Sequence, residues 1–128
     1  MNKYHNRKVI VDGIAFDSKK EARRYQELKM LQDAGEISRL ERQVKFELIP
    51  EQRAWTNEIY ENGRKKGCFK KGKLLERKVE YVADFVYMKD GEVIVEDVKG
   101  YRDGGAYRVF VIKRKLMLYR FGLKVIEI

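Results

Sequence analysis

The sequence has 128 residues, a length that suits one domain with a modest core. Its 29 lysines and arginines outnumber 20 aspartates and glutamates, and the formal net charge of +9 favours a polyanionic partner, either a nucleic acid or an anionic membrane surface. The single cysteine, Cys68, excludes an internal disulfide, and the single histidine, His5, disfavours nuclease chemistries that need several histidines. No long apolar run is present, so we expect no signal peptide and no transmembrane helix. We expect no membrane partner, because neither predicted helix combines a basic face with an aromatic one, and a cytoplasmic location, because one cysteine suits a reducing compartment.

The first third of the chain predicts a short hairpin followed by a helix. Asp12 and Gly13 separate two apolar segments, as in a two-residue hairpin turn. A helix is expected over about 19–34. Ser18 is placed to cap its start, and Gly35 is placed to end it.

A predicted strand then leads into a polar, basic insertion. Residues 40–49 alternate between apolar and polar side chains, and Pro50 ends the strand. Residues 51–76 are rich in lysine and predict either a mobile loop or a loose basic ribbon. We expect the aromatic side chains of the insertion to pack beneath it, with stacking on unpaired bases as the alternative: Trp55, Tyr60 and Phe69.

Residues 81–101, YVADFVYMKDGEVIVEDVKGY, predict a second hairpin with acidic residues inside apolar strands. Asp90-Gly91 is a strong signal for a type I′ turn, because both central residues of that turn need positive φ. With these two residues as the loop, the numbers of paired residues sum to 181. Asp84 is then expected directly opposite Asp97.

Two opposed carboxylates need a physical explanation, since at about 5 Å they repel by roughly 3 kcal/mol. A bound cation would remove this repulsion. The strand alternation places Lys99 on the face of Asp97, while Glu96 points the other way. The alternative is that Asp97 and Lys99 form a strand-end ion pair and that Asp84 is a solvated edge residue. The surrounding apolar residues favour a central strand instead: Val93, Ile94, Val95 and Val98.

Glu21 has two interpretations. With Ser18 it fits a capping box, in which a glutamate at the third helical position bonds back to the cap. Yet Tyr25 and Leu28 lie on either side of Glu21 around the helix, so Glu21 sits in the middle of the face that should pack on the sheet. A buried carboxylate needs a partner. We therefore expect a role beside the two aspartates, and a capping role remains open.

The remainder of the chain predicts a helix over about 106–121, ended by Gly122, and a final strand over 123–128. Without the N-terminal hairpin and the basic insertion, the order is helix, strand, strand, strand, helix, strand. This order predicts an α/β fold with a mixed sheet of about four strands flanked by helices. We expect residues 1–128 to form a single domain.

These residues and their order resemble the PD-(D/E)XK nuclease superfamily. That superfamily has an aspartate on its second core strand and a (D/E)-x-K motif on the third, and Asp84 and Asp97-Val98-Lys99 match these positions. Ala83 stands where proline is usual. The segments VDGIAFDSKKEARRYQEL, YVADFVY and EDVKG also resemble small phage proteins described as Holliday junction resolvase-like or of unknown function. They resemble the endonuclease subunit that cuts transposon ends as well, and the likeness covers nearly the whole chain except 51–76.

The resemblance implies an αβββαβ, restriction-endonuclease-like core and metal-dependent hydrolysis of DNA. Carboxylate oxygens suit Mg²⁺ or Mn²⁺. The implied ligands are Asp84, Asp97, Glu21 and the main-chain carbonyl of Val98. Lys99 would orient the nucleophile or stabilise the transition state, and Gln43, on the first core strand, is a candidate supporting residue behind the ligands.

The predicted substrate is DNA. Three groups of mostly basic residues are expected to contact it. The insertion offers Arg64, Lys65, Lys66, Lys70, Lys71 and Lys73, the second helix offers Arg108, Lys113, Arg114, Lys115 and Arg120, and the loop before it offers Tyr101 and Arg102. The leading hypothesis is an endonuclease for branched DNA such as Holliday junctions, which by analogy implies a homodimer. The alternatives are the same chemistry on duplex ends or transposon-like junctions, or a nucleic-acid-binding module that does not cut.

Overall fold

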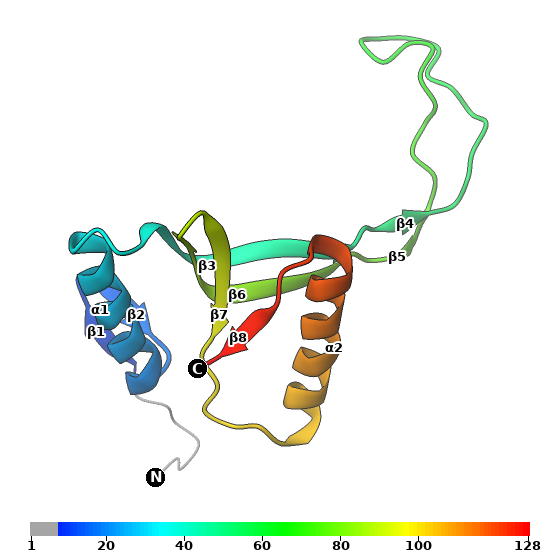
Figure 1. Cartoon of the computed structure of the whole chain (residues 1–128). Helices are drawn as coiled ribbons and strands as arrows, with labels where there is room; N and C mark the ends of the chain where they lie inside the picture. Colours follow the sequence, from blue (N-terminus) through cyan, green and yellow to red (C-terminus); the bar gives the residue numbers. More distant parts are fainter. Residues whose placement is uncertain (1–7) are drawn as a thin grey trace. The chain divides into compact units, whose positions relative to one another are not determined.

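A computed structural model describes residues 8–128, and His5 lies outside the described residues (Figure 1). The chain divides into two compact units. The first comprises the chain up to Phe46 together with Tyr81–Ile128, and the second is Glu47–Glu80. The second unit contains the predicted insertion.

A four-stranded mixed sheet and two helices form the first unit (Figure 1). The strands lie in the order β3-β6-β7-β8, with β6 and β7 antiparallel and β7 and β8 parallel. Their bounds are β3 Ser38–Ile49, β6 Val79–Lys89, β7 Glu92–Asp97 and β8 Val125–Glu127, and the helices are α1 Lys19–Asp33 and α2 Gly104–Phe121. The predicted α/β class and the four-stranded mixed sheet are therefore confirmed.

Both predicted hairpins form with the expected turns. Strands β1 (Val9–Val11) and β2 (Ile14–Phe16) pair around Asp12-Gly13, and β6 and β7 pair around Asp90-Gly91. All four turn residues have φ between 50° and 78°, as a type I′ turn requires. The β6–β7 register runs from Lys89↔Glu92 to Phe85↔Glu96, which confirms the predicted pairing sum. Asp84 and Asp97 are the next residues along these two strands.

The helix ends follow the predicted capping residues. The Ser18 hydroxyl accepts a hydrogen bond from the Glu21 N–H (3.1 Å), and Gly35 follows the end of α1 with φ 80°. Helix α2 starts two residues earlier than predicted, because the Asp103 carboxylate caps it by accepting from the Gly104 N–H (2.7 Å). Gly122, in the left-handed conformation, ends α2 as expected.

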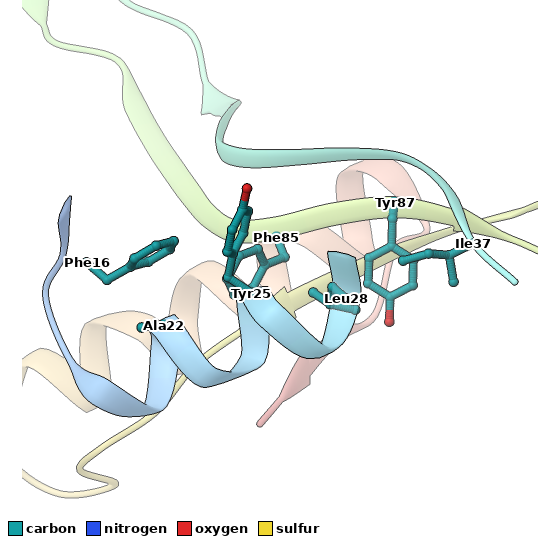
Figure 2. Close-up of a cluster of buried hydrophobic side chains, with 7 residues drawn as sticks. All are labelled: Phe16, Ala22, Tyr25, Leu28, Ile37, Phe85 and Tyr87. Carbon is teal, nitrogen blue, oxygen red and sulfur yellow. The ribbon is translucent and has the colours of Figure 1, made fainter. Parts of the chain in front are cut away.

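The hydrophobic core beneath α1 positions the helix against β6. Tyr25 and Leu28 on α1 point toward Phe85 and Tyr87 on β6 (Figure 2). The Phe16 ring closes the cluster, with its centroid 5.1 Å from that of Tyr25. Burial of this face fixes the rotation of α1, and the same face carries Glu21 toward the sheet.

A second aromatic cluster lies beneath α2. Tyr81 packs between Phe46 and Phe110, with ring centroids 6.4 Å and 6.2 Å away. Phe46 also contacts Phe121 at the end of α2, at a centroid distance of 5.7 Å. The first core strand, β6 and α2 are thereby fixed together.

The second unit is a two-stranded ribbon, as one of the two predicted alternatives proposed (Figure 1). Strands β4 (Gln52–Arg53) and β5 (Leu74–Glu76) pair in antiparallel fashion, and Ile59 forms an isolated bridge with Phe69 farther along. No helix in residues 8–128 combines the length and the apolar character needed to cross a membrane.

Candidate functional site

Four elements of the first unit bring acidic and amide side chains together. Glu21 comes from the first turn of α1, Gln43 from β3, Asp84 from β6 and Asp97 from the end of β7. The Gln43 side-chain amide donates to Glu21 Oε1 (3.3 Å) and to Asp84 Oδ1 (3.2 Å). One amide group thus connects the helix to the central strand.

Gln43 has an unusual backbone conformation for a strand residue. Its φ is 50°, in the left-handed region that costs a non-glycine residue on the order of 1–3 kcal/mol. Strained backbone of this kind persists only where the surrounding structure holds it in place, and it is enriched at active sites and ligand-binding positions. Here the residue that bears the strain is the one that contacts both carboxylates.

Asp84 is held from both sides. Its Oδ1 accepts from Gln43, and its Oδ2 accepts from the Val98 backbone N–H (2.8 Å). Strand β6 lies between β3 and β7, so Asp84 is not a solvated edge residue. The contact with Val98 also shows that Asp84 lies beside the Asp97-Val98-Lys99 segment.

Asp97 is buried and makes two polar contacts. The Tyr81 hydroxyl donates to Asp97 Oδ2 (2.6 Å), and the Lys99 ammonium pairs with Asp97 Oδ1 (2.8 Å). The same ammonium lies 3.5 Å from the centroid of the Phe110 ring. The ion pair of the simpler interpretation therefore exists, but it is part of a cluster that also includes an aromatic ring of α2.

The electrostatic environment of the cluster opposes ionisation of Glu21. Burial and the nearby charge of Asp84 raise the pKa of Glu21 to about 7, against the opposing effect of Arg42. Burial also raises the pKa of Asp84, and the negative charge of Asp97 adds to this shift. The charge of Asp97 therefore acts against ionisation of Asp84, in the direction that their predicted pairing implies.

Three further side chains contact the cluster and were not predicted from the sequence. Tyr81 was expected only as part of a strand. Arg42 stacks on the Phe16 ring (4.3 Å from its centroid) and lies 3.8 Å from Glu21 Oε1, while the Lys20 ammonium donates to the Lys99 carbonyl (2.8 Å). No spacing rule identifies these residues, because their roles depend on how β3 and α1 meet.

Glu96 serves the packing of the fold. It is 1% exposed and accepts two hydrogen bonds from the Arg24 guanidinium, at 2.8 Å and 2.7 Å, and a further one from the Tyr87 hydroxyl. Its contacts differ entirely from those of Asp97, as the predicted alternation of the strand requires. This network joins α1 to β6 and β7.

The fit of these donor groups to a metal ion is partial. Within residues 8–128, no group of three or more His, Cys, Asp or Glu side chains is arranged to hold a metal by itself. Mg²⁺, however, is usually bound by one or two carboxylates together with water and substrate phosphate. Asp84 and Asp97 supply two carboxylates, which are ligands of the kind that Mg²⁺ needs from the protein.

The predicted DNA-contacting residues fall into two groups. Arg102 and Arg114 are engaged by the Glu127 carboxylate, at 3.5 Å and 3.0 Å, so part of their charge is neutralised within the fold. Tyr101, Arg108 and Lys115 are exposed and Lys113 is half-buried. The six ribbon residues predicted to contact DNA are all exposed: Arg64, Lys65, Lys66, Lys70, Lys71 and Lys73.

The aromatic residues of the ribbon do not all pack as predicted. Trp55 is 87% exposed and Phe69 is 66% exposed, so the expectation that they pack beneath the insertion is wrong. Only Tyr60 is half-buried, with the Lys65 and Lys70 ammonium groups each 5.9 Å from its ring centroid. A ribbon this narrow has no interior that could cover a tryptophan.

The comparison with protein families identifies one match, which covers residues 1–126 and is described as a protein of unknown function, DUF1064. The chain belongs to the DUF1064 family. No curated protein and no solved structure matches it. The function of this DUF1064 protein must therefore be inferred from its own side chains.

Replacing Glu21 with glutamine tests the electrostatics of the cluster in this DUF1064 protein. The pKa of Glu21 rises from 4.5 to about 7 on folding, so its contribution to stability is full below pH 4.5 and is lost as the pH rises through 7. Glutamine mimics the protonated acid. We expect Glu21→Gln to raise the free energy of unfolding by about 1–2 kcal/mol at pH 8, allowing for solvent screening, and to leave it unchanged near pH 4.

Urea denaturation at both pH values measures this difference. Glu36→Gln, at an exposed position after α1, is the matched control and should change stability at neither pH. A Glu21→Gln protein that is no more stable than the parent at pH 8 would contradict the crowding of carboxylates, and unchanged stability would favour a capping role, because glutamine can still cap at the third helical position.

Proposed function

We propose that this protein is a metal-dependent DNA endonuclease that hydrolyses phosphodiester bonds, with branched or recombination-intermediate DNA such as Holliday junctions as its substrate. The fold we infer is the αβββαβ core of restriction-endonuclease-like proteins. Its element order, α1-β3-β6-β7-α2-β8 apart from the β1–β2 hairpin and the ribbon strands, agrees with this proposal. The same chemistry on duplex ends or transposon-like junctions remains the alternative substrate choice.

The observation that carries the proposal is the chain of contacts that links Glu21, Asp84 and the Asp97-Val98-Lys99 segment. Gln43 connects Glu21 to Asp84, and the Val98 N–H connects Asp84 to the third strand. A protein selected only for stability would gain from apolar groups here, since crowded carboxylates that raise one another's pKa oppose folding. Such arrangements are characteristic of sites that bind cations or transfer protons.

The chain's own residues have distinct roles in the proposed hydrolysis. A water oxygen forms a bond to phosphorus, the phosphorus–oxygen bond to one strand breaks, and the leaving oxygen takes up a proton. Glu21, with a pKa of about 7, is suited to accept the proton of the attacking water. Lys99 would stabilise the negative charge on the phosphate. Tyr81 positions Asp97 by donating a hydrogen bond to Asp97 Oδ2.

Mg²⁺ or Mn²⁺ would be held by Asp84 and Asp97, with Glu21 and the Val98 carbonyl as further candidates. When bound, the ion would polarise the phosphate and lower the pKa of the attacking water. Each carboxylate offers about four acceptor positions. Asp97 can therefore keep its contacts with Tyr81 and Lys99 and still contribute a lone pair to a cation.

The basic ribbon is proposed as a DNA-binding arm. Its lysines and arginine are exposed, and cations of this kind bind phosphates without reading sequence. The chain offers only Cys68 for thiol chemistry and has a charge of +9, which agrees with a nucleic-acid partner in a reducing cytoplasm. A homodimer is proposed by analogy with enzymes that cut two strands symmetrically.

A DNA-binding protein that does not cut is the second candidate. Asp97 already has partners in Tyr81 and Lys99, and the described residues contain no preformed three-ligand metal group. These two observations favour a structural cluster. The cleavage experiment separates the candidates.

Asp97→Asn is expected to abolish cleavage, by several orders of magnitude, while DNA affinity stays equal or rises. The change removes one negative charge near the phosphate and retains an oxygen that Tyr81 can donate to. The measurement uses labelled four-way junction, flap, duplex and single-stranded DNA, with Mg²⁺, with Mn²⁺ and with chelator. A thermal melt of the variant verifies that the fold is intact.

Glu92→Gln is the matched control for this prediction, because Glu92 is an exposed acid on the same strand. It should cut like the parent. If the parent cuts none of the four substrates with either metal, the endonuclease proposal is wrong, and DNA binding alone would support the second candidate. If the Asp97→Asn variant cuts DNA as fast as the parent, Asp97 is not part of the catalytic site.

Replacing four ribbon lysines with alanine is expected to weaken DNA binding and to flatten its salt dependence: Lys65, Lys66, Lys70 and Lys71. The slope of log affinity against log salt should fall by roughly 0.9 for each phosphate that the variant no longer neutralises. Fluorescence anisotropy of labelled DNA over a salt series measures both quantities. The control removes four exposed cations elsewhere, Lys8, Arg23, Lys89 and Lys124. Equal reductions of affinity in the two variants would rule out a specific role of the ribbon.

A further inference from the structure

The ribbon exposes two aromatic side chains in a basic setting. Trp55 and Phe69 are 87% and 66% exposed, and Ile59, which is paired with Phe69, is also exposed. Leaving large apolar groups in water forfeits the free energy that their burial would supply. A partner that covers them would recover it.

The backbone of the ribbon holds these side chains on a defined scaffold. The Ala54 N–H donates to the Lys73 carbonyl (2.8 Å), and the Lys70 N–H donates to the Glu58 carbonyl (2.8 Å). A third bond, from the Tyr60 N–H to the Cys68 carbonyl (3.0 Å), continues the ribbon toward its tip. Trp55 follows the first of these bonds, and Phe69 lies between the other two.

Tyr60 shows that an aromatic residue of the ribbon can have a purely internal role. It is half-buried, and two lysine ammonium groups lie over its ring. Among the described residues, Trp55 and Phe69 have no ring contact or cation contact of this kind. Their exposure is therefore not explained by packing within the ribbon.

The charge of the ribbon indicates the chemistry of the partner. Residues 54–73 contain six basic side chains and two acidic ones, Glu58 and Glu61, for a net charge of +4. Phosphates neutralise such a surface, and bases offer flat faces on which aromatic rings stack. An anionic membrane is the competing partner, and the vesicle titration below distinguishes it from DNA.

Unpaired bases fit the ribbon better than a duplex does. In a duplex, an aromatic ring reaches a base face only by separating stacked base pairs, which costs a few kcal/mol per step. In a single strand, gap or flap, that cost is largely absent, and each aromatic–base stack strengthens binding about 5- to 150-fold. Branched DNA presents such bases where its strands separate.

We propose that Trp55 and Phe69 form a binding site for unpaired DNA bases, with the ribbon lysines contacting the flanking phosphates. The inference rests on the proposed function only in naming DNA as the partner, and it specifies which DNA the protein prefers. It does not depend on cleavage. Trp55 is the single tryptophan of the chain, so its fluorescence reports on this site alone.

The test measures Trp55 fluorescence while the protein is titrated, in the presence of a chelator. The four titrants are oligo-dT, a blunt duplex, the same duplex with a short single-stranded gap, and phosphatidylserine-containing vesicles. Stacking on bases quenches tryptophan. We expect strong quenching by oligo-dT and the gapped duplex and much weaker quenching by the blunt duplex at equal occupancy. Trp55→Ala should lose about 5- to 150-fold in affinity for oligo-dT and gapped DNA, measured by anisotropy, and at most about 2-fold for the blunt duplex.

Two further variants keep the test specific. Trp55→Phe retains an aromatic ring and should bind within a few-fold of the parent. Tyr119→Ala removes an aromatic side chain that is 90% exposed on α2, outside the ribbon, and should leave affinity unchanged. Equal quenching by blunt and gapped duplexes, no quenching by any DNA, or a spectral blue shift with vesicles alone would each overturn the inference.

The two proposals fail in different ways. If Trp55→Ala binds gapped DNA like the parent but the parent cuts DNA with Mg²⁺, the stacking site is wrong and the endonuclease stands. If no DNA is cut but Trp55 is quenched selectively by unpaired bases, the stacking site stands and the second candidate function replaces the first.

Discussion

The burial of Glu21 beside Asp84, at the junction of α1 with the sheet, is the constraint that the contacts around Gln43 must satisfy. Glu21 can occupy this position only because Gln43 and Arg42 approach it from β3, and burial and Asp84 still raise its pKa to about 7. The strained backbone of Gln43 is a further cost at the same point. The apolar core beneath α1 supplies the stability that offsets these costs, and a cation would relieve the repulsion directly.

Much of the fold could be predicted because local chemistry determines it. Asp90-Gly91 has few alternatives to a type I′ turn, and the turn alone fixes the register that brings Asp84 beside Asp97. Glu21 was placed on the packing face because Tyr25 and Leu28 lie on either side of it around the helix, and both are buried. In each case, a period of two or of 3.6 residues carries the information.

The rest could not be predicted because it depends on contacts between distant segments. The positive φ of Gln43 has no signal in a glutamine, and the roles of Arg42 and Tyr81 arise only when β3, β6 and the helices are in place. The exposure of Trp55 was predicted wrongly for a related reason. Apolar side chains are expected to be buried, but a two-stranded ribbon lacks a second layer to bury them.

Direct observation of a metal at the cluster is the measurement that tests the central claim most directly. In crystals soaked with Mn²⁺, the anomalous signal should lie between the carboxylates of Asp84 and Asp97, with metal–oxygen distances of roughly 2.0–2.2 Å. It should disappear in Asp84→Asn crystals grown in the same way. Mn²⁺ bound only elsewhere, with Asp97 still paired to Lys99 and Asp84 still bonded to Gln43, would contradict a metal-dependent site and leave the cluster as a structural feature of the sheet.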